Sequence, residues 1–268
     1  MGIESVVMKK PLLDVLFMSE KRKNTLLLLK DEPHEMEYLL KSLDTNRQAL
    51  LPQIRVLEEH YLVTHDKDTY ELTTLGKLIT AEMIPLIDIT DVLDIDISYW
   101  GTHKLDFIPS HLFNRISELG PCNLIKIGLH EVFVEDKQFT EEAERSESVF
   151  TMSSFVFPNF EKTLSELIAN KVNISIIISK ELSEKLMNDN SEKFKVLSQN
   201  SNINLSIYPN RFDFLSISIN DYSIMLKLLT HQGVSDNKRV ICSSESALQW
   251  GKELFEYYLK KSVLIDKF

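Results

Sequence analysis

The segment HEMEYLLKSLDTNRQALLPQIRVLEEHYLVTHDKDTYELTTLGKLITAE, residues 34–82, decides how the first part of the chain folds. Its apolar residues recur at helical spacing in two short stretches, and we expect both stripes to face inward. The first stripe is Met36, Leu39, Leu40 and Leu43, and the second is Leu50, Ile54, Leu57 and Tyr61. Two such helices, followed by a hairpin and a third helix, are typical of a winged helix-turn-helix. The second helix of that motif has the size to enter the major groove of DNA.

The hairpin, or wing, is predicted over residues 61–65 and 69–72. Both runs contain the Val, Thr and Tyr side chains that favour strands, and a polar turn separates them. Lys67 lies at the tip of that turn between two aspartates, where it would reach a phosphate or the minor groove. Thr73 or Thr74 is expected to cap the next helix. The apolar stripe of that helix is Leu75, Leu78, Ile79 and Met83.

The outward side of the second helix carries the residue types that contact DNA. Thr45 is a suitable N-cap for this helix, and amide and guanidinium groups beyond it can hydrogen-bond base edges and phosphates. The side chains predicted to contact double-stranded DNA are Thr45, Asn46, Arg47, Gln48, Gln53, Arg55, Lys67 and Lys77. Because a proline inside a helix costs about 3 kcal/mol or more, Pro52 leads us to expect a helix that begins near Leu50, after a turn over residues 45–49.

The charge balance is the main objection to DNA binding. The chain has a formal net charge of −10, and residues 1–82 hold eleven Lys and Arg against fourteen Asp and Glu, a net of −3. The field of the whole molecule therefore attracts DNA only weakly. Local positive charge has to supply the contacts. A cluster at Lys9, Lys10, Lys21, Arg22 and Lys23 is either part of that charge or a solvated helix face.

Composition and motifs exclude several other classes of protein. At 268 residues with 43% hydrophobic content, the chain can bury one or two cores. It has no apolar run of about 18 residues and no recognisable export signal, so we expect a cytoplasmic protein that does not enter a membrane. Cys122 and Cys242 belong to no Cys/His motif, and we expect two small buried side chains rather than a zinc site or a redox pair. The GxxxxGK[ST], GxGxxG, HExxH and GxSxG motifs are missing, and no cofactor or metal is predicted.

After residue 120 the pattern changes to alternating strands and helices. Strands are expected at residues 123–130, 148–156, 172–179 and 203–209, followed by a hairpin over 213–219 and 222–229 and a short strand near 239–244. Because helical stretches join the early strands, the pattern predicts parallel crossovers within a mixed sheet. The fold class is thus α+β and α/β. We expect a winged helix-turn-helix over residues 1–84, a helical linker over 85–120 and an α/β sensor and dimerisation domain over 121–268.

The chain closes with an amphipathic helix, ESALQWGKELFEYYLKK, capped by Ser243 or Ser244. Its expected buried face is Leu248, Gly251, Leu254, Phe255, Tyr258 and Leu259.

Taken together, the chain resembles the transcriptional regulators of methanogenic archaea that join an ArsR-like winged helix to a methanogenesis-regulatory, or filament-regulator, C-terminal domain. The resemblance covers nearly all of the chain. Its most specific passages are ALLPQIRVLEEHYLV at 49–63, KDTYELTTLGKLIT at 67–80, a W-x-x-H-x-L-x-x-I-P-x-H-L string that begins at Trp100, and ALQWGKELFEYYLKKS at 247–262. It implies sequence-specific DNA binding by the N-terminal domain and sensing or dimerisation by the C-terminal one.

A ligand of the second domain is expected beyond the carboxyl ends of the parallel strands, where open α/β sheets form a crevice. Arg211 could hold a carboxylate there, and Trp100 and His103 are expected to lock the linker to the sheet. The candidate ligand-binding residues by position are His130, Phe157, Lys180, Tyr208 and Arg211.

Two other functions remain open at this point. One is a protein-binding adaptor whose winged helix does not bind DNA. The other is a phosphodiesterase-like enzyme, because the C-terminal topology resembles one half of a phospholipase D-like fold. That chemistry needs a His, a Lys two residues on and an Asp five beyond, whereas the H-x-K of this chain is His65-Asp66-Lys67 in the wing and residue 72 is Leu. We therefore predict no enzyme, no catalytic residue, and a homodimeric DNA-binding regulator controlled by a small molecule or another signal.

Overall fold

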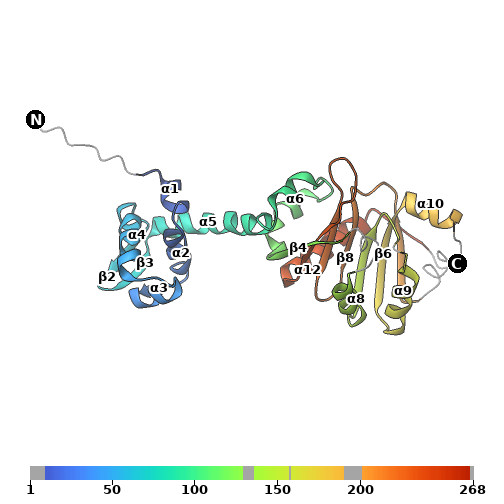
Figure 1. Cartoon of the computed structure of the whole chain (residues 1–268), viewed down its shortest axis with the longest axis horizontal. Coiled ribbons are helices and arrows are strands. Elements are labelled where there is room, and N and C mark those ends of the chain that lie inside the picture. Colours follow the sequence, from blue (N-terminus) through green and yellow to red (C-terminus); the bar gives the residue numbers. More distant parts are fainter. Residues whose placement is uncertain (1–9, 129–135, 157, 190–200, 266–268) are drawn as a thin grey trace, which may run out of the picture. The chain divides into compact units, whose positions relative to one another are not determined.

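The computed structural model describes residues 10–128, 136–156, 158–189 and 201–265 (Figure 1). The chain divides into two compact units, residues 1–87 and 88–268. Each unit is built around its own cluster of buried apolar side chains. In the part of the chain that the structure describes, no helix is both long enough and apolar enough to cross a membrane.

The first unit combines helices with a small antiparallel sheet whose strand order is β1-β3-β2. Its helices are α1 (Leu12–Phe17), α2 (Glu20–Leu28), α3 (Met36–Ser42), α4 (Arg47–Glu59) and the first part of α5 (Thr74–Leu93). Its strands are β1 (His34–Glu35), β2 (Val63–Asp66) and β3 (Thr69–Leu72). The predicted order of two helices, a hairpin and a third helix is therefore present, preceded by α1 and α2.

Helix α4 begins earlier than Pro52 led us to expect. It starts at Arg47, and its cap is Asn46 rather than Thr45, because Asn46 Oδ1 accepts a hydrogen bond from the backbone N–H of Ala49 at 3.0 Å. Pro52 deprives the Gln48 carbonyl of its helical donor. Both residues are exposed, so water can hydrate that carbonyl and the proline is tolerated.

The inward stripe of α4 is confirmed for three of its four residues. Leu50, Ile54 and Leu57 are fully buried, whereas the side chain of Tyr61 is 68% exposed. The prediction for Tyr61 was wrong because α4 ends at Glu59 and the chain reverses at Tyr61, where φ is 58°.

Helix α5 is longer than predicted. The Thr73 hydroxyl accepts a hydrogen bond from the backbone N–H of Gly76 at 3.0 Å and caps the helix as expected. The helix then continues to Leu93 with Pro85 inside it, so the first part of the helical linker predicted over residues 85–120 is the end of α5.

The second unit is organised around an eight-stranded mixed sheet of order β11-β7-β6-β5-β8-β9-β10-β4. The strands are β4 (Cys122–Lys126), β5 (Ser148–Ser153), β6 (Asn173–Ser179), β7 (Ile203–Tyr208), β8 (Phe214–Ile219), β9 (Ile224–Leu228), β10 (Lys238–Cys242) and β11 (Val263–Leu264). The helices are α6 (Ile97–Thr102), α7 (Ser110–Phe113), η1 (Ile116–Leu119), α8 (Lys137–Glu144), α9 (Phe160–Ala169), α10 (Lys180–Asp189) and α12 (Glu245–Leu259).

Helices cover both faces of this sheet (Figure 1). On one face α12 packs against β5, where the rings of Phe150 and Phe255 lie 5.1 Å apart. On the other face, α8 and α9 contribute Ala143 and Leu164 to a separate apolar cluster that includes Ile176 of β6. Alternate residues of one strand therefore belong to different cores.

The strand pairing confirms part of the predicted topology. Strands β5, β6 and β7 are parallel neighbours joined by helices, and β8 and β9 form the expected antiparallel hairpin. Strand β4 was expected to begin this parallel series, but it lies at the far edge of the sheet and pairs antiparallel with β10. The expectation was wrong because β8, β9 and β10 lie between β5 and β4.

The same pairing overturns the prediction for the two cysteines. Cys122 and Cys242 are register partners on β4 and β10, with Cα atoms 4.3 Å apart, and they form a disulfide. Their separation of 120 residues in sequence hid a contact that only the sheet creates.

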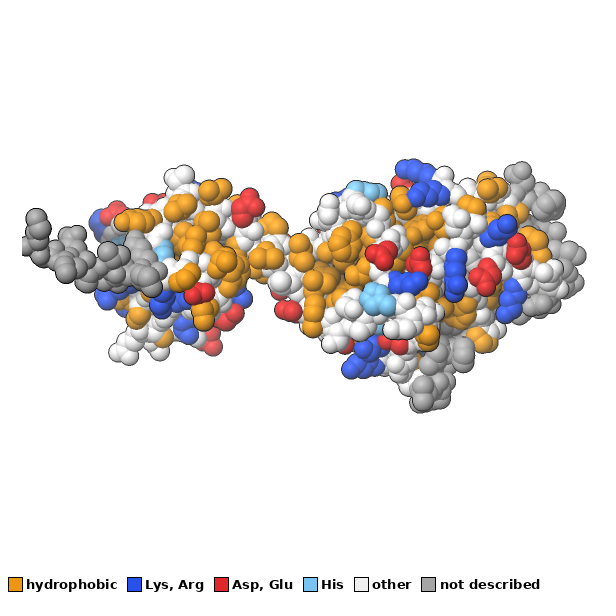
Figure 2. Space-filling view, turned by 90° about the horizontal axis from the view of Figure 1, so that it is seen from above, with side chains coloured by type: hydrophobic (Ala, Val, Ile, Leu, Met, Phe, Trp, Pro, Cys, Tyr) orange, Lys and Arg blue, Asp and Glu red, His pale blue; other side chains and the backbone are white. Residues whose placement is uncertain are grey.

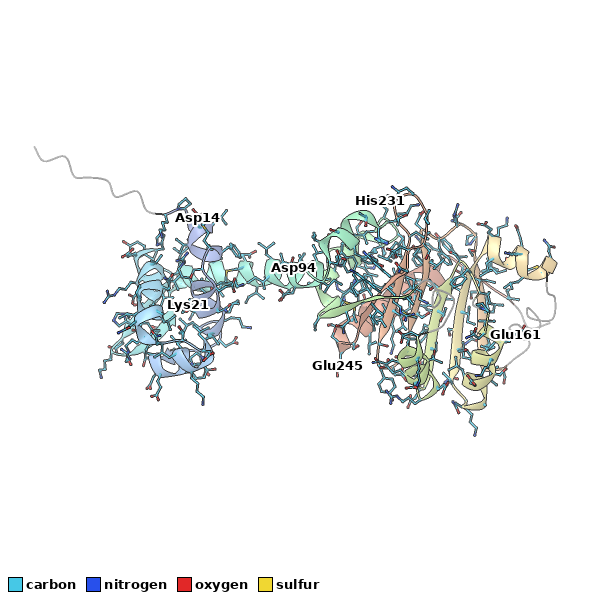
Figure 3. All side chains as sticks on the ribbon, in the orientation of Figure 1. Asp14, Lys21, Asp94, Glu161, His231 and Glu245 are labelled. Carbon is cyan, nitrogen blue, oxygen red and sulfur yellow. A yellow bond between two sulfur atoms is a disulfide. The ribbon has the colours of Figure 1, made fainter. Side chains whose placement is uncertain are left out.

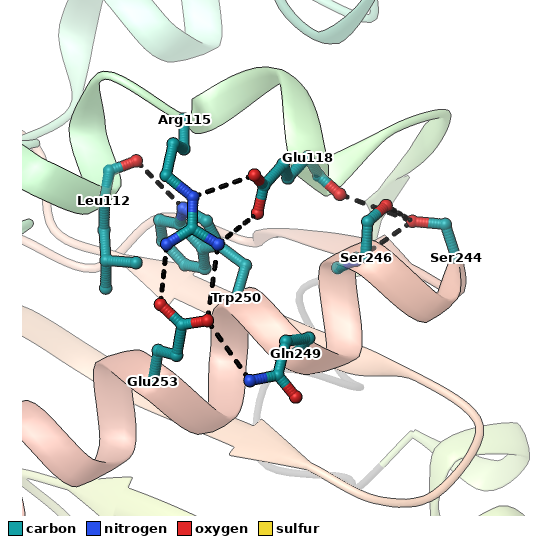
Figure 4. Close-up of polar contacts among 9 residues, drawn as sticks. Leu112, Arg115, Glu118, Ser244, Ser246, Gln249, Trp250 and Glu253 are labelled. Carbon is teal, nitrogen blue, oxygen red and sulfur yellow. Dashed lines mark hydrogen bonds and ion pairs between the residues drawn. The ribbon is translucent and has the colours of Figure 1, made fainter.

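Within the second unit, residues 112–118 are joined to α12 by a polar network (Figure 4). Arg115 donates hydrogen bonds to Glu118, 2.8 and 2.7 Å away, and to Glu253 of α12, 2.7 Å away. The indole N–H of Trp250 donates to the carbonyl of Leu112 at 2.9 Å. Trp250 is fully buried, although the sequence analysis had not placed it on the inner face of α12.

The structure tests two further predictions for this region, and the first is confirmed. Ser244 caps α12, since its hydroxyl accepts from the backbone N–H of Ala247 at 3.1 Å. His103 is 2% exposed and its Nε2 lies 3.2 Å from Asp236, in the loop between β9 and β10. His103 thus lies beside this loop, whereas the indole N–H of Trp100 donates to the carbonyl of Val92 in α5 and not to the sheet, so the expected lock of Trp100 to the sheet is not made by this hydrogen bond.

Candidate nucleic-acid interface and ligand cleft

The face of α4 turned away from the core is formed by Gln48, Pro52, Arg55 and Glu59. These residues recur at intervals of four, three and four and are all exposed. Because Leu50, Ile54 and Leu57 hold the opposite face in the core, the orientation of α4 within the first unit is fixed. An amide and a guanidinium are thus presented to solvent about two helical turns apart.

Arg47, the first residue of α4, is held by the wing. Its Nη2 lies 2.7 Å from Asp68 Oδ2, and both side chains are about half exposed. This hydrogen bond raises the pKa of Arg47 above its ordinary value. A second contact between wing and helix joins His65 Nδ1 to Glu58 Oε1, 2.5 Å apart. The hairpin and α4 therefore form one surface.

Two predicted DNA contacts are engaged inside the unit instead. The Asn46 side chain caps α4, as described above. Gln53 Oε1 accepts hydrogen bonds from Ser19 at 3.2 Å and from the guanidinium of Arg22 at 2.7 Å. Arg22 is 6% exposed and also donates to the carbonyl of Val15 at 2.6 Å. Arg22 is therefore not available to DNA as part of the basic cluster predicted around residues 21–23. Gln53 instead joins α4 to α2.

The remaining predicted cations lie on the surface. Lys67 is exposed at the wing tip in a left-handed conformation with a φ of 55°, and Lys77 is exposed on α5. Thr45 is half-buried in the turn before α4. Lys21 lies on α2 (Figure 3) and is half-buried. The described candidates that are exposed and do not cap the helix are therefore Arg47, Gln48, Arg55, Lys67 and Lys77.

The second unit has a cleft of about 610 Å³ at the carboxyl ends of β5 and β6. This is the edge where the sequence analysis placed a ligand. Its walls come from the segments after these two strands, from α10 and from the loops beside β8 and β9. The polar lining residues are Ser154, Ser179, Glu181, Lys185, Arg211 and Ser235.

Of the five predicted ligand residues, the structure places Arg211 in the cleft wall. Lys180 follows β6 between two lining residues, and its side chain is exposed. Tyr208 instead belongs to an aromatic cluster, where its ring stacks on Phe212 with centroids 4.9 Å apart. His130 and Phe157 lie outside the described residues.

Lys185 and Glu181 line the cleft but were not predicted from the sequence. Both lie on α10, one helical turn apart, so both reach the same cleft. The rule that ligands gather at strand ends selected Lys180, the residue directly after β6. Glu181 and Lys185 follow it on α10 at a spacing of four, and this helical spacing was the signal that could have added them as a pair.

The first unit also exposes apolar side chains, which form a broad area in the view of Figure 2. The exposed apolar residues of α1 and its cap are Leu12, Leu13, Phe17 and Met18, and those of α5 include Leu75, Leu78 and Leu86. Leu13, Met18 and Leu78 are more than half exposed, with values of 71%, 76% and 60%.

Family models match both parts of the chain. Residues 10–91 match the N-terminal domain of the methanogenesis regulatory protein FilR1, and residues 133–261 match its middle domain. The methanogenesis regulatory protein FilR1 of Methanothrix harundinacea (strain 6Ac) is 24% identical over 270 residues, covering 93% of this chain. The chain spans 57% of the length of that relative.

Similar solved structures are more distant. The archaeal chromatin protein TrmBL2, whose structure is described as showing a novel mode of DNA binding, has a TM-score of 0.43 and 14% identity, covering 96% of this chain and 97% of its own. NucT from Helicobacter pylori has a TM-score of 0.40 and 13% identity, covering 54% of this chain and 98% of its own. Scores this low say nothing about function.

Proposed function

Because this chain belongs to the family of methanogenesis regulatory proteins, we propose that it is a transcriptional regulator that binds specific double-stranded DNA sequences through a winged helix-turn-helix in its first unit. The observation that carries the proposal is the single surface formed by α4 and the β2–β3 wing. On it, Gln48 and Arg55 provide groups for base edges and phosphates, and Lys67 provides a cation at the wing tip.

Selection of bound sequences from random duplexes at low salt tests this function. We expect enrichment of one sequence and a footprint over it. Gln48→Ala should weaken binding to that sequence by about 1–3 kcal/mol, because a base contact is lost, and should leave binding to unrelated duplexes nearly unchanged. Lys67→Ala should weaken binding to all duplexes alike. It should also reduce the slope of log K against log salt concentration (the salt slope) by about 1.

Lys30→Ala is the matched control for Lys67→Ala. It removes an equal charge from an exposed residue after α2, outside the proposed surface, and should leave the salt slope unchanged. If no sequence is enriched and no footprint forms at low salt, the winged helix serves protein contacts and the chain is an adaptor.

We further propose that the regulator is a homodimer, which would place two winged helices on half-sites about one helical turn apart. The exposed leucines of α5 support this, since apolar side chains gathered on a surface mark association sites. Leu78→Glu should lower the mass measured by analytical ultracentrifugation from dimer to monomer. Ile97→Glu, at an equally exposed apolar residue of α6, should not. A monomeric wild-type chain at micromolar concentration contradicts the proposal.

Control by a signal would act through the second unit, whose cleft collects polar groups at the carboxyl ends of β5 and β6. A ligand there can change DNA binding only as far as it binds one arrangement of the dimer more tightly than the other. Native mass spectrometry of the chain purified from its own host would detect a retained metabolite and the dimer together.

A further inference from the structure

A second cavity, of about 130 Å³, lies between the sheet of the second unit and the helices α8 and α9. Most of its walls are apolar, and they include Phe139 of α8, Leu164 of α9 and Ile176 of β6. Protein interiors are close-packed and rarely contain a space larger than a water molecule. An unfilled space of this size within the apolar cluster under α8 and α9 costs stability, so an occupant would stabilise the second unit.

The charged side chains that line the cavity are already engaged within the protein. Asp136 Oδ2 lies 2.8 Å from Nη2 of Arg239, and its Oδ1 accepts a hydrogen bond from the backbone N–H of Phe139 at 2.8 Å. Lys227 of β9 also has an interaction of its own. Because an ion that enters an apolar space loses its hydration, it needs a charged partner there. The described walls offer it none that is unengaged, and they therefore favour a neutral molecule.

One hydroxyl on the sheet side of the cavity has no partner among the described residues. It belongs to Ser216 of β8, which lines the cavity and is 3% exposed. Its Oγ is not sealed off by neighbouring atoms, so it is open to the cavity. Since buried hydroxyls normally have a hydrogen-bond partner, Ser216 is an anchor for a polar atom of a guest.

The hydroxyls beside Ser216 are engaged. Thr151 Oγ1 donates to Ser218 Oγ at 3.3 Å, which joins the side chains of two neighbouring strands. Ser153 Oγ donates to the carbonyl of Phe155 at 2.6 Å. A buried water molecule makes about three hydrogen bonds, whereas the free hydroxyl supplies only one of them. Water is therefore a poor occupant of this cavity.

We propose that this cavity binds a small neutral molecule with an apolar body and one acceptor oxygen. The body packs between α8, α9 and the sheet, and the oxygen accepts a hydrogen bond from Ser216. An engineered apolar cavity of about 150 Å³ stays dry and binds benzene, so a guest of about six non-hydrogen atoms fits. The proposal goes beyond the function proposed above, because it concerns the second unit alone and does not require DNA binding.

Cyclopentanone, methylenecyclopentane and cyclopentanecarboxylate are the probes that test it, added to the full chain with labelled isoleucine methyl groups. They share one ring and carry a carbonyl oxygen, a methylene group and a charged group, respectively. Ile174, Ile176 and Ile178 line the cavity and report binding directly. We expect saturable shifts of these methyl signals with the ketone and the alkene and none with the carboxylate. No saturable shift with the ketone, or a carboxylate that binds as tightly as the ketone, would overturn the proposal.

Ser216→Ala tests the anchor. Loss of the hydroxyl should raise the Kd of cyclopentanone about three- to tenfold, because a neutral hydrogen bond is lost, and should not raise that of methylenecyclopentane. The matched control is Ser206→Ala on β7, where the serine is 2% exposed and is not among the residues that line the cavity; it should change neither Kd. A Kd of the ketone that stays constant in Ser216→Ala, or rises only as much as that of the alkene, would overturn the proposal.

Ala143→Leu tests the place of binding. Ala143 lines the cavity from α8, so a larger side chain there should weaken the binding of both ligands. Glu141→Leu, at a side chain of α8 that is 62% exposed, should change neither. Binding by Ala143→Leu as tight as that of the wild type would mean that the ligands lie elsewhere. If Ala143→Leu does not fold, the three probes and Ser216→Ala still decide.

Discussion

Arg47 has two competing partners in the proposed complex, Asp68 of the wing and the phosphates of DNA. In the free protein its guanidinium lies 2.7 Å from the Asp68 carboxylate. Because that pair is exposed, it is weak in water, and a phosphate can replace it. Asp68 also adds a negative charge beside the surface that DNA would approach.

Asp68→Asn should therefore tighten DNA binding. Loss of the carboxylate frees Arg47 and removes a repulsion, so we expect about two- to fivefold tighter binding and a salt slope steeper by about 0.9 for each phosphate gained. Fluorescence anisotropy over a series of salt concentrations measures both. The matched control is Asp66→Asn, which removes the same charge two residues away from a side chain that does not contact Arg47 in the described structure. Equal effects of the two substitutions would mean that only net charge matters.

At the scale of single residues, periodicity predicted the buried side chains within α4 but not which polar side chains are hydrogen-bonded. Leu50, Ile54 and Leu57 followed from spacing within one helix. The sequence alone could not show that Gln53 is unavailable to DNA, since its hydrogen-bond partner Arg22 is 31 residues away and on another helix. The residue types that recognise DNA also make contacts between helices, and only the packing of α2 on α4 distinguishes the two roles.

Among the elements, α5 depends on one glycine. A Cβ at Gly76 would lie 1.9 Å from the backbone oxygen of Leu62. The close approach of α5 to the chain before β2 therefore requires a residue without a Cβ at this position. Gly76→Ala should lower the free energy of unfolding of the first unit by roughly 1–3 kcal/mol, or more if the backbone cannot shift. Urea denaturation followed by circular dichroism measures it. The control is Gly101→Ala in α6, where an added Cβ would meet no neighbouring group within 4 Å, so this substitution should be neutral or stabilising. An equal loss of unfolding free energy there would refute the steric reason.

The junction of η1 with α12 should be sensitive to acid. Arg115 holds the pKa of Glu253 below its ordinary value of 4.5, chiefly through their hydrogen bond. A lowered pKa in the folded state means that the contribution of this carboxylate is complete above about pH 4.5 and is lost as the pH falls through the folded value. Glu253→Gln should therefore destabilise the second unit at pH 7 and flatten its loss of stability in acid. Glu256→Gln, on the exposed side of α12, should leave the profile unchanged; a profile of Glu253→Gln as steep as that of the wild type would contradict the argument.

Elements were predictable where the signal is local. The β2–β3 hairpin, the caps at Thr73 and Ser244 and the hairpin of β8 and β9 each depend on a few neighbouring residues. The place of β4 was not predictable, because its own sequence fits an edge strand or the first strand of a crossover equally well. The position of β4 is set by its pairing with β10, more than 110 residues later in the chain. The same pairing brings the two cysteines together.

For the whole molecule, the two units should unfold separately, since each has its own core. The chain offers a direct way to tell them apart. Its two tryptophans, Trp100 and Trp250, are both buried in the second unit, so tryptophan fluorescence reports that unit alone. Circular dichroism, in contrast, reports the helices of both.

The disulfide should stabilise only the second unit. Cys122 and Cys242 are the only cysteines of the chain, so a reductant has a single target. Linking residues 120 apart restricts the unfolded chain, and chain-entropy reasoning gives at most roughly 5 kcal/mol for such a loop, with about 2–4 kcal/mol typical. We therefore expect a reductant, or the double substitution Cys122→Ser and Cys242→Ser, to move the urea midpoint of tryptophan fluorescence downward. The dichroism transition of the first unit should not move, and Gly76→Ala should do the reverse. A reductant that moved both transitions would show that the units stabilise one another, and one that moved neither would show that the two strands hold their register without the bond.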